Sequence, residues 1–220
     1  MLASFITALV LAALPSAQIV AEQPISFTGV VQAVDFGPGI ICAPPTHEIE
    51  CAGGTFFLTS TTINLNFYIG KNVKLTGTNI GAGCPTWDVS AVEDPPPTSL
   101  IFCGSPTPSC PIRLRSVPGG ISQHFLLLGF SPGLTPKNLY SGSLLLGDPW
   151  FVLASTSGAV GLEGAAFDFQ LPGDAALAGL SVWFQAVRRD VGPVGPFRFS
   201  NAVCITLTGP SPPCIDPLGC

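Results

Sequence analysis

Residues 197–207 read FRFSNAVCITL, and apolar and polar side chains alternate along this stretch. A period of two residues is typical of a β-strand with one buried face. One face would carry Phe197, Phe199, Val203, Ile205 and Leu207, and the opposite face Ser200, Cys204 and Thr206. We therefore predict a strand whose Cys204 points away from the core, where it would form a disulfide with an outer segment such as the linker or the tail.

The composition of the whole chain indicates that the rest of the fold also consists of β-strands. The 220 residues include 25 glycines and 23 prolines, which interrupt helices, and only 10% of the residues are charged. Long solvated helices are therefore excluded, and we predict an all-β protein. The net charge of −5 argues against nucleic-acid binding, which requires clustered Lys and Arg.

The C-terminal half contains further short strands separated by Gly and Pro turns. We predict strands at 112–117, 124–130, 143–147, 151–155, 166–171, 181–187 and 197–207. One helical turn is expected at 174–179, where Asp174 is suited to cap it. This spacing predicts an antiparallel β-sandwich over residues 112–208.

The N-terminal half also consists of short strands, over residues 22–94. They are predicted at 27–36, 55–60, 63–68, 73–78 and 87–92, the third from the alternation of Ile63, Leu65 and Phe67 with polar neighbours. The unit ends in the phrase YIGKNVKLTGT, residues 68–78, followed by a final strand. This succession resembles small OB-like barrels, which implies a partly closed five-stranded barrel.

Proline marks the joints between these units. Three consecutive prolines, 95–97, follow Asp94 and cannot continue a ladder. We therefore assign 95–111 to a Pro- and Cys-rich linker and 209–220 to a Pro- and Cys-rich tail.

Four phrases of the C-terminal half carry a second resemblance. They are HFLLLGF (124–130), LPGDAALAGL (171–180), WFQA (183–186) and SNAV (200–203). Together they resemble an uncharacterised module of secreted proteins from planctomycete-type bacteria. The resemblance implies a bacterial, exported β-sandwich, and it implies no catalytic activity or ligand.

The first 21 residues, MLASFITALVLAALPSAQIVA, hold no charged side chain and an apolar run, which predicts a secretory signal peptide cleaved after Ala21 or Ala17. No later apolar run is long enough to span a membrane. We expect a secreted protein, or one of the periplasm or cell envelope.

Eight cysteines lie beyond this segment: Cys42, Cys51, Cys84, Cys103, Cys110, Cys204, Cys214 and Cys220. An even number in an oxidising compartment indicates disulfides. Short loops favour the pairs Cys42–Cys51, Cys103–Cys110 and Cys214–Cys220, which leaves Cys84–Cys204.

Several motifs suggest catalysis, but each lacks a requirement. The stretch GFSPG, 129–133, matches a nucleophile elbow, which needs a following helix and a later histidine. Pro132 disfavours the helix and no histidine follows His124, so we interpret the motif as a strand-to-turn junction. We expect His124 to be a strand-end residue.

His47 lies between Cys42 and Cys51, which are potential zinc ligands only as free thiolates. Because disulfides are expected, we predict that His47 lies on the surface of a disulfide-closed hairpin. The acidic pairs Glu48/Glu50 and Glu93/Asp94 are expected to be exposed surface carboxylates rather than a glycosidase pair. We predict no catalytic residue, no cofactor and no metal.

The remaining candidates belong to a binding surface. Phe56, Tyr68 and Trp87 are candidate ligand-face aromatics of the barrel, and Lys71 and Lys74 are its only basic residues. The expected partner is therefore an envelope protein or a glycan. Outward-facing Trp183 could mark an interface or lie under a covering loop. The sequence predicts a secreted non-catalytic protein with a binding or structural role; the alternative is a secreted hydrolase of unrecognised type.

Overall fold

The computed structural model describes residues 23–34, 47–51, 56–81, 85–136, 140–160, 164–190, 196–209, 214–215 and 217. Within these ranges the regular elements are strands and two short 3-10 helices. The prediction of an all-β protein is confirmed. The proposed signal peptide lies outside the described residues.

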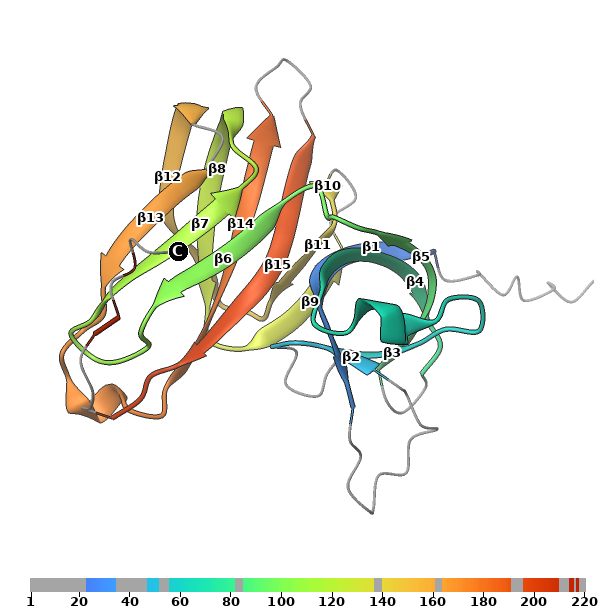
Figure 1. The fold of residues 1–220 in the computed structure, drawn as a ribbon, viewed down its shortest axis with the longest axis horizontal. Coiled ribbons are helices and arrows are strands. Elements are labelled where there is room, and N and C mark those ends of the chain that lie inside the picture. The colour runs from blue at the N-terminus through green and yellow to red at the C-terminus, as the bar shows by residue number, and fades with distance from the viewer. Residues whose placement is uncertain are drawn as a thin grey trace, which may run out of the picture.

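Five strands of the N-terminal half close into a barrel, seen at the right of Figure 1. They are β1 (Ile25–Ala33), β2 (His47–Ile49), β3 (Phe57–Thr59), β4 (Asn72–Asn79) and β5 (Thr86–Glu93), in the order β1-β2-β3-β5-β4. The β3–β5 pair is parallel and the other pairs are antiparallel. Phe27, Leu58, Leu75 and Val89 fill the interior.

Residues 63–68 do not form the predicted strand. Their second part is a 3-10 helix, η1 (Leu65–Tyr68), in which Leu65 is buried and Phe67 is 72% exposed. The side chain of Asn64 accepts a hydrogen bond from the Asn66 backbone N–H at 3.1 Å. This local bond competes with strand pairing and caps the helical turn.

The C-terminal half is built from three sheets. A five-stranded sheet has the order β10-β15-β14-β8-β12, a three-stranded sheet the order β13-β7-β6, and β11 pairs with β9. The bounds are β6 (Ser99–Gly104), β7 (Pro111–Val117), β8 (Gly120–Gly129), β9 (Pro132–Pro136), β10 (Tyr140–Ser141), β11 (Ser143–Leu146), β12 (Trp150–Val160), β13 (Ala165–Gln170), β14 (Ser181–Asp190) and β15 (Phe197–Thr206). All seven strands predicted here are present.

The five-stranded and three-stranded sheets enclose a common core of Leu114, Leu126, Phe167, Phe184 and Ile205. Strand β6 lies within 95–111, so part of the predicted linker belongs to a sheet. A pairing register from Ser99 opposite Val117 to Gly104 opposite Ile112 holds it there. The sequence of this strand, SLIFCG, is a short apolar run without alternation, and the flanking prolines suggested a connector.

The helical turn predicted at 174–179 is confirmed as η2 (Ala175–Leu177). Asp174 is its N-cap, and its carboxylate accepts a hydrogen bond from the Ala176 N–H at 2.9 Å. This bond satisfies a backbone donor that has no partner within the turn.

Strand β15 contains an irregularity that changes which face its side chains occupy. On β14, Gln185 opposes Ala202 whereas Val187 opposes Phe199, so Ser200 and Asn201 share the place opposite one residue. An extra residue reverses the alternation of side chains along a strand. The prediction of one continuous apolar face on 197–207 is therefore wrong.

The apolar side chains before the irregularity therefore lie on the opposite face of β15 from those after it. Ile205 and Leu207 pack into the core between the sheets. Phe197 and Phe199 pack with Val187 on the opposite, outer face of the five-stranded sheet.

The barrel lies on this outer face, next to β11 and β15 (Figure 1). Leu145 of β11 is buried in the barrel core, and Ala202 of β15 packs against it. Ser143 Oγ donates a hydrogen bond to the Ser26 carbonyl at 2.6 Å. The two halves of the chain therefore share a packed interface.

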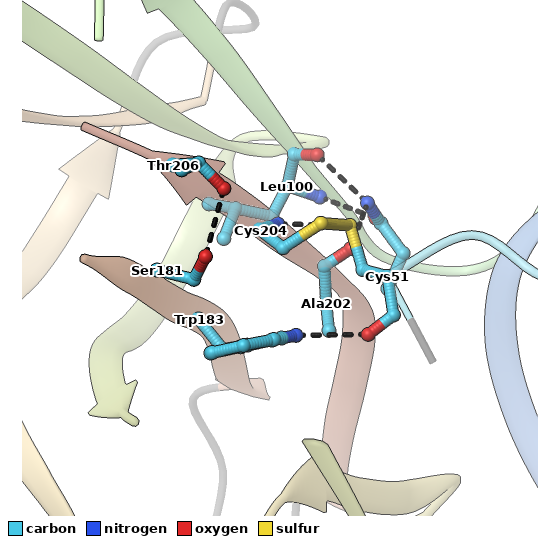
Figure 2. Close-up of a disulfide and its surroundings, with 8 residues drawn as sticks. Cys51, Leu100, Ser181, Trp183, Ala202, Cys204 and Thr206 are labelled. Atoms are coloured by element: carbon cyan, nitrogen blue, oxygen red, sulfur yellow. Dashed lines mark hydrogen bonds between the residues drawn. A yellow bond between two sulfur atoms is a disulfide. The ribbon is translucent and has the colours of Figure 1, made fainter. Parts of the chain in front are cut away.

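A disulfide between Cys51 and Cys204 crosses this interface. Trp183 opposes Cys204 on the neighbouring strand, and its indole N–H donates to the Cys51 carbonyl at 2.8 Å (Figure 2). Cys204 thus points away from the core, as predicted, but it is bonded to the barrel rather than to the linker or the tail. Trp183 is covered by the same segment.

The short-loop disulfide pairings predicted from the sequence are wrong. Cys51 bonds Cys204 and Cys110 bonds Cys214, which excludes all four predicted pairs. Cys103 is also disulfide-bonded, whereas Cys42, Cys84 and Cys220 lie outside the described residues. Docking of the barrel on β15 brings cysteines 153 residues apart into bonding range, so sequence proximity was a poor guide.

Replacing both Cys51 and Cys204 with serine should lower the free energy of unfolding by about 2–5 kcal/mol, because the bond restricts a long loop of the unfolded chain. Urea unfolding followed by tryptophan fluorescence measures the loss. As a control, Ser181→Ala with Thr206→Ala removes only an exposed 2.8 Å cross-strand hydrogen bond nearby and should cost under about 1 kcal/mol. Equal midpoints for wild type and the serine variant would contradict the role of this bond.

Candidate binding surface

The outer face of the five-stranded sheet is only partly covered. Beside the barrel and the β9–β11 pair it retains an apolar hollow of about 300 Å³. It is lined by Phe125 and Leu127 of β8, Val187 of β14, Phe197 and Phe199 of β15, Trp150 and Val152 of β12, and Leu144 of β11. None of these side chains is titratable, so the hollow is suited to apolar groups rather than to proton transfer.

Charged residues lie near the hollow at the ends of β14 and β15. The Arg189 guanidinium lies 5.3 Å from the centre of the Phe197 ring. Asp190 accepts from Arg188 at 2.7 Å and from Arg198 at 3.2 Å. These cations are held by an aromatic ring or a carboxylate, which leaves the apolar lining as the main feature of the hollow.

Sequence reasoning did not find this surface. Residues 150–153, WFVL, are four consecutive apolar residues, whereas a strand with one wet face alternates. All four are at least 36% exposed. The uninterrupted run was the available signal, but it equally fits a strand buried on both faces.

The predicted ligand-face aromatics lie elsewhere. Phe56 and Trp87 are each only 7% exposed and belong to the barrel core, where Trp87 contacts Phe27 edge to face at 5.9 Å. Closure of the barrel turns one face of each strand inward, and large rings fill that interior. This corrects the expectation that Phe56 and Trp87 form a ligand face. Tyr68 is half-buried, with Lys71 Nζ 5.6 Å from its ring centre.

The structure brings His124 together with two serines. Its Nε2 lies 2.7 Å from Ser122 Oγ and its Nδ1 2.9 Å from Ser116 Oγ. All three side chains are fully buried between the sheets, so no substrate can reach the serine oxygens in this conformation. His124 is an internal strand residue that links β8 to β7, and not a strand-end residue as predicted.

His47 is also buried, at 3% exposed, and its Nε2 lies 3.2 Å from Asn66 Oδ1. The expectation of a surface histidine is therefore wrong, because β2 is a barrel strand and this side chain points inward. Cys51 is bonded to Cys204 and offers no thiolate for zinc. Within the described residues no group of three or more metal-ligating side chains occurs.

The acidic pairs are dispersed among separate contacts. Glu93 forms a 3.1 Å ion pair with Lys74, and Asp94 a 3.4 Å ion pair with Lys71. Burial raises the pKa of Glu48. The serine of the elbow-like motif, Ser131, precedes strand β9 rather than a helix, as the strand-to-turn interpretation predicted.

Comparisons with known proteins add no relative: no family model, curated protein or solved structure matches the chain. In the described part of the chain, no helix has the length and apolar character needed to cross a membrane.

The two buried histidines predict how stability depends on pH. Burial lowers the pKa of both His47 and His124, and the Arg188 charge lowers that of His124 further although Asp190 raises it. Below pH 6.5 the unfolded chain therefore binds more protons than the folded one, and stability falls as pH falls. Each histidine can add at most about 1.4 kcal/mol per pH unit to this slope.

His124→Gln retains a donor and an acceptor for the two serines and should give a shallower dependence of unfolding free energy on pH between 7.5 and 5.5. Urea unfolding at each pH measures the slope. His47→Gln is the matched comparison, and the double variant should show the least slope. The raised pKa of Glu48 has the opposite effect on stability, near the ordinary glutamate pKa of 4.5, and this effect is the same in all the variants. An unchanged slope in His124→Gln would refute the assignment.

Proposed function

We propose that this chain is a secreted, non-catalytic protein of two β modules, which acts in the cell envelope or outside the cell by binding another protein. The first module is an OB-like barrel and the second a β-sandwich related to the module of planctomycete-type bacteria. A binding role is preferred to a hydrolase because the serine and histidine side chains that lie together are buried.

The arrangement of strands supports the modular part of the proposal. A five-stranded barrel in the order β1-β2-β3-β5-β4, with β3 and β5 parallel, has the size and mixed pairing expected of an OB-like barrel. The five-stranded and three-stranded sheets that enclose one core support the sandwich.

The observation that carries the binding role is the apolar hollow beside Trp150 and Val152. Exposed apolar patches of this kind mark interaction sites on soluble proteins. A glycan would require polar side chains to pair with its hydroxyl groups, whereas the lining is aliphatic and aromatic. The hollow therefore favours a protein over a glycan among the two partners expected.

Export is supported by the disulfides, which persist in oxidising compartments, and by the apolar N-terminal segment. Expression of the full chain in a bacterial host should yield extracytoplasmic protein lacking residues 1–21 or 1–17. Mass spectrometry with thiol labelling should find eight fewer free thiols before reduction than after it. Cytoplasmic retention with labelled thiols, or bound zinc, would contradict the proposal.

A photo-cross-linking experiment tests the binding role in the exported protein. Val152, 57% exposed on β12 and part of the lining of the hollow, is replaced by p-benzoylphenylalanine, with the same replacement at Phe67, 72% exposed on η1, as the control. Illumination should give a covalent adduct with a second polypeptide from position 152 and a much weaker one from position 67. Equal adducts, no adduct, or cross-links within one chain would refute this surface as the binding site.

A further inference from the structure

Strand β12 is an unprotected edge of the five-stranded sheet. Among the described strands it pairs only with β8, so one row of its backbone N–H and C=O groups has no ladder partner. Its sequence, WFVLASTSGAV, contains neither a charged residue nor a proline. Edge strands that remain free normally carry such residues to prevent pairing with another chain.

The same edge exposes an apolar patch. Trp150 is 36% exposed, Phe151 51%, Val152 57% and Leu153 42%. Phe130, 49% exposed, extends the patch through an edge-to-face contact with Phe151 at 6.5 Å between ring centres. The irregular pairing between Val152 and Ala154 leaves Leu153 as an extra residue on the edge.

The area of this patch matches the apolar part of a protein interface. Large side chains present about 150–250 Å² each, so the five exposed fractions amount to about 450 Å². A standard interface buries about 800 Å² on each partner, of which about 57–65% is apolar. The patch therefore supplies the apolar share of one complete, ordinary-sized interface.

We propose that β12 is the interface of a symmetric dimer, in which the β12 strands of two copies pair antiparallel. This inference rests on the proposed function, in that it names the protein partner of the same surface. A two-fold axis brings the same patch of both copies together, so each apolar residue meets an apolar residue of the partner. The pairing also satisfies the unpaired backbone groups of both edges.

The charge distribution is compatible with self-association, although each chain carries a net charge of −5. The patch itself holds no charge, and exposed Asp148 lies at the beginning of the strand. With the axis near Val152, the two Asp148 residues lie on opposite sides, about 27 Å apart along the paired strands. Their repulsion is therefore small at physiological ionic strength.

Such a dimer would also place the two hollows beside each other. An axis perpendicular to the sheet joins the two five-stranded sheets and keeps their outer faces on the same side. Because Trp150 and Val152 line the hollow and belong to the paired strand, the hollows of the two copies become neighbours across the axis.

Light scattering on the oxidised, exported protein at high micromolar concentration tests the proposal. Wild type should have twice the mass of one chain. Phe151→Lys should weaken the dimer by at least about 100-fold, because the symmetric interface contains the substitution twice. Phe67→Lys, an equally drastic change on an exposed phenylalanine of the barrel, should leave the dimer intact. Thermal unfolding verifies that both variants fold.

Amide hydrogen exchange gives a second readout on wild type. Residues 150–154, which pair across an axis near Val152, should be protected at high concentration and lose that protection on dilution, whereas β13 should not change. A monomeric wild type, or equal dissociation of the two lysine variants, would overturn the dimer. Cross-linking from position 152 to a different polypeptide, with a monomeric purified protein, would overturn the dimer while leaving the proposed binding role standing.

Discussion

The hydrogen bonds at the irregularity of β15 are the constraint on which the rest of the structure depends. Ser200 Oγ accepts from the Ala186 N–H at 2.9 Å and donates to the Asn201 carbonyl at 2.7 Å. The Asn201 amide accepts from the Leu100 N–H at 2.8 Å and donates to the Leu100 carbonyl at 3.1 Å. These bonds replace ladder bonds that the extra residue interrupts, and they join β6 to β15.

Both functional features of the outer face follow from this irregularity. On one side of it Cys204 points outward and bonds the barrel; on the other, Phe197 and Phe199 point outward and line the hollow. The fully buried Gln185 holds β11 on the outer face, between the barrel and the hollow. Its side chain accepts from the Leu145 N–H at 2.8 Å and donates to the Ser143 carbonyl at 3.0 Å. The barrel and β11 therefore cover one end of the face and leave the other end open.

Local patterns predicted much of the fold and little of the site. The strands of the C-terminal half and the Asp174 cap were found because their signals depend on neighbours within a few residues. The alternation at 63–68 misled because Asn64 offers its own local hydrogen bond. Phe56 and Trp87 are aromatic, as in many binding platforms, but in the closed barrel their side chains point inward and form part of the core.

By itself, the sequence determined that the protein is all-β, where most strands lie, and that its cysteines form disulfides, because periodicity, turn residues and cysteine content act locally or through composition. Only the tertiary structure decided that Cys51 bonds Cys204, that both histidines are buried, and that WFVL lies on a free edge. Those outcomes depend on contacts between residues far apart in the chain and on one extra residue that reverses the faces of β15, which no local pattern encodes.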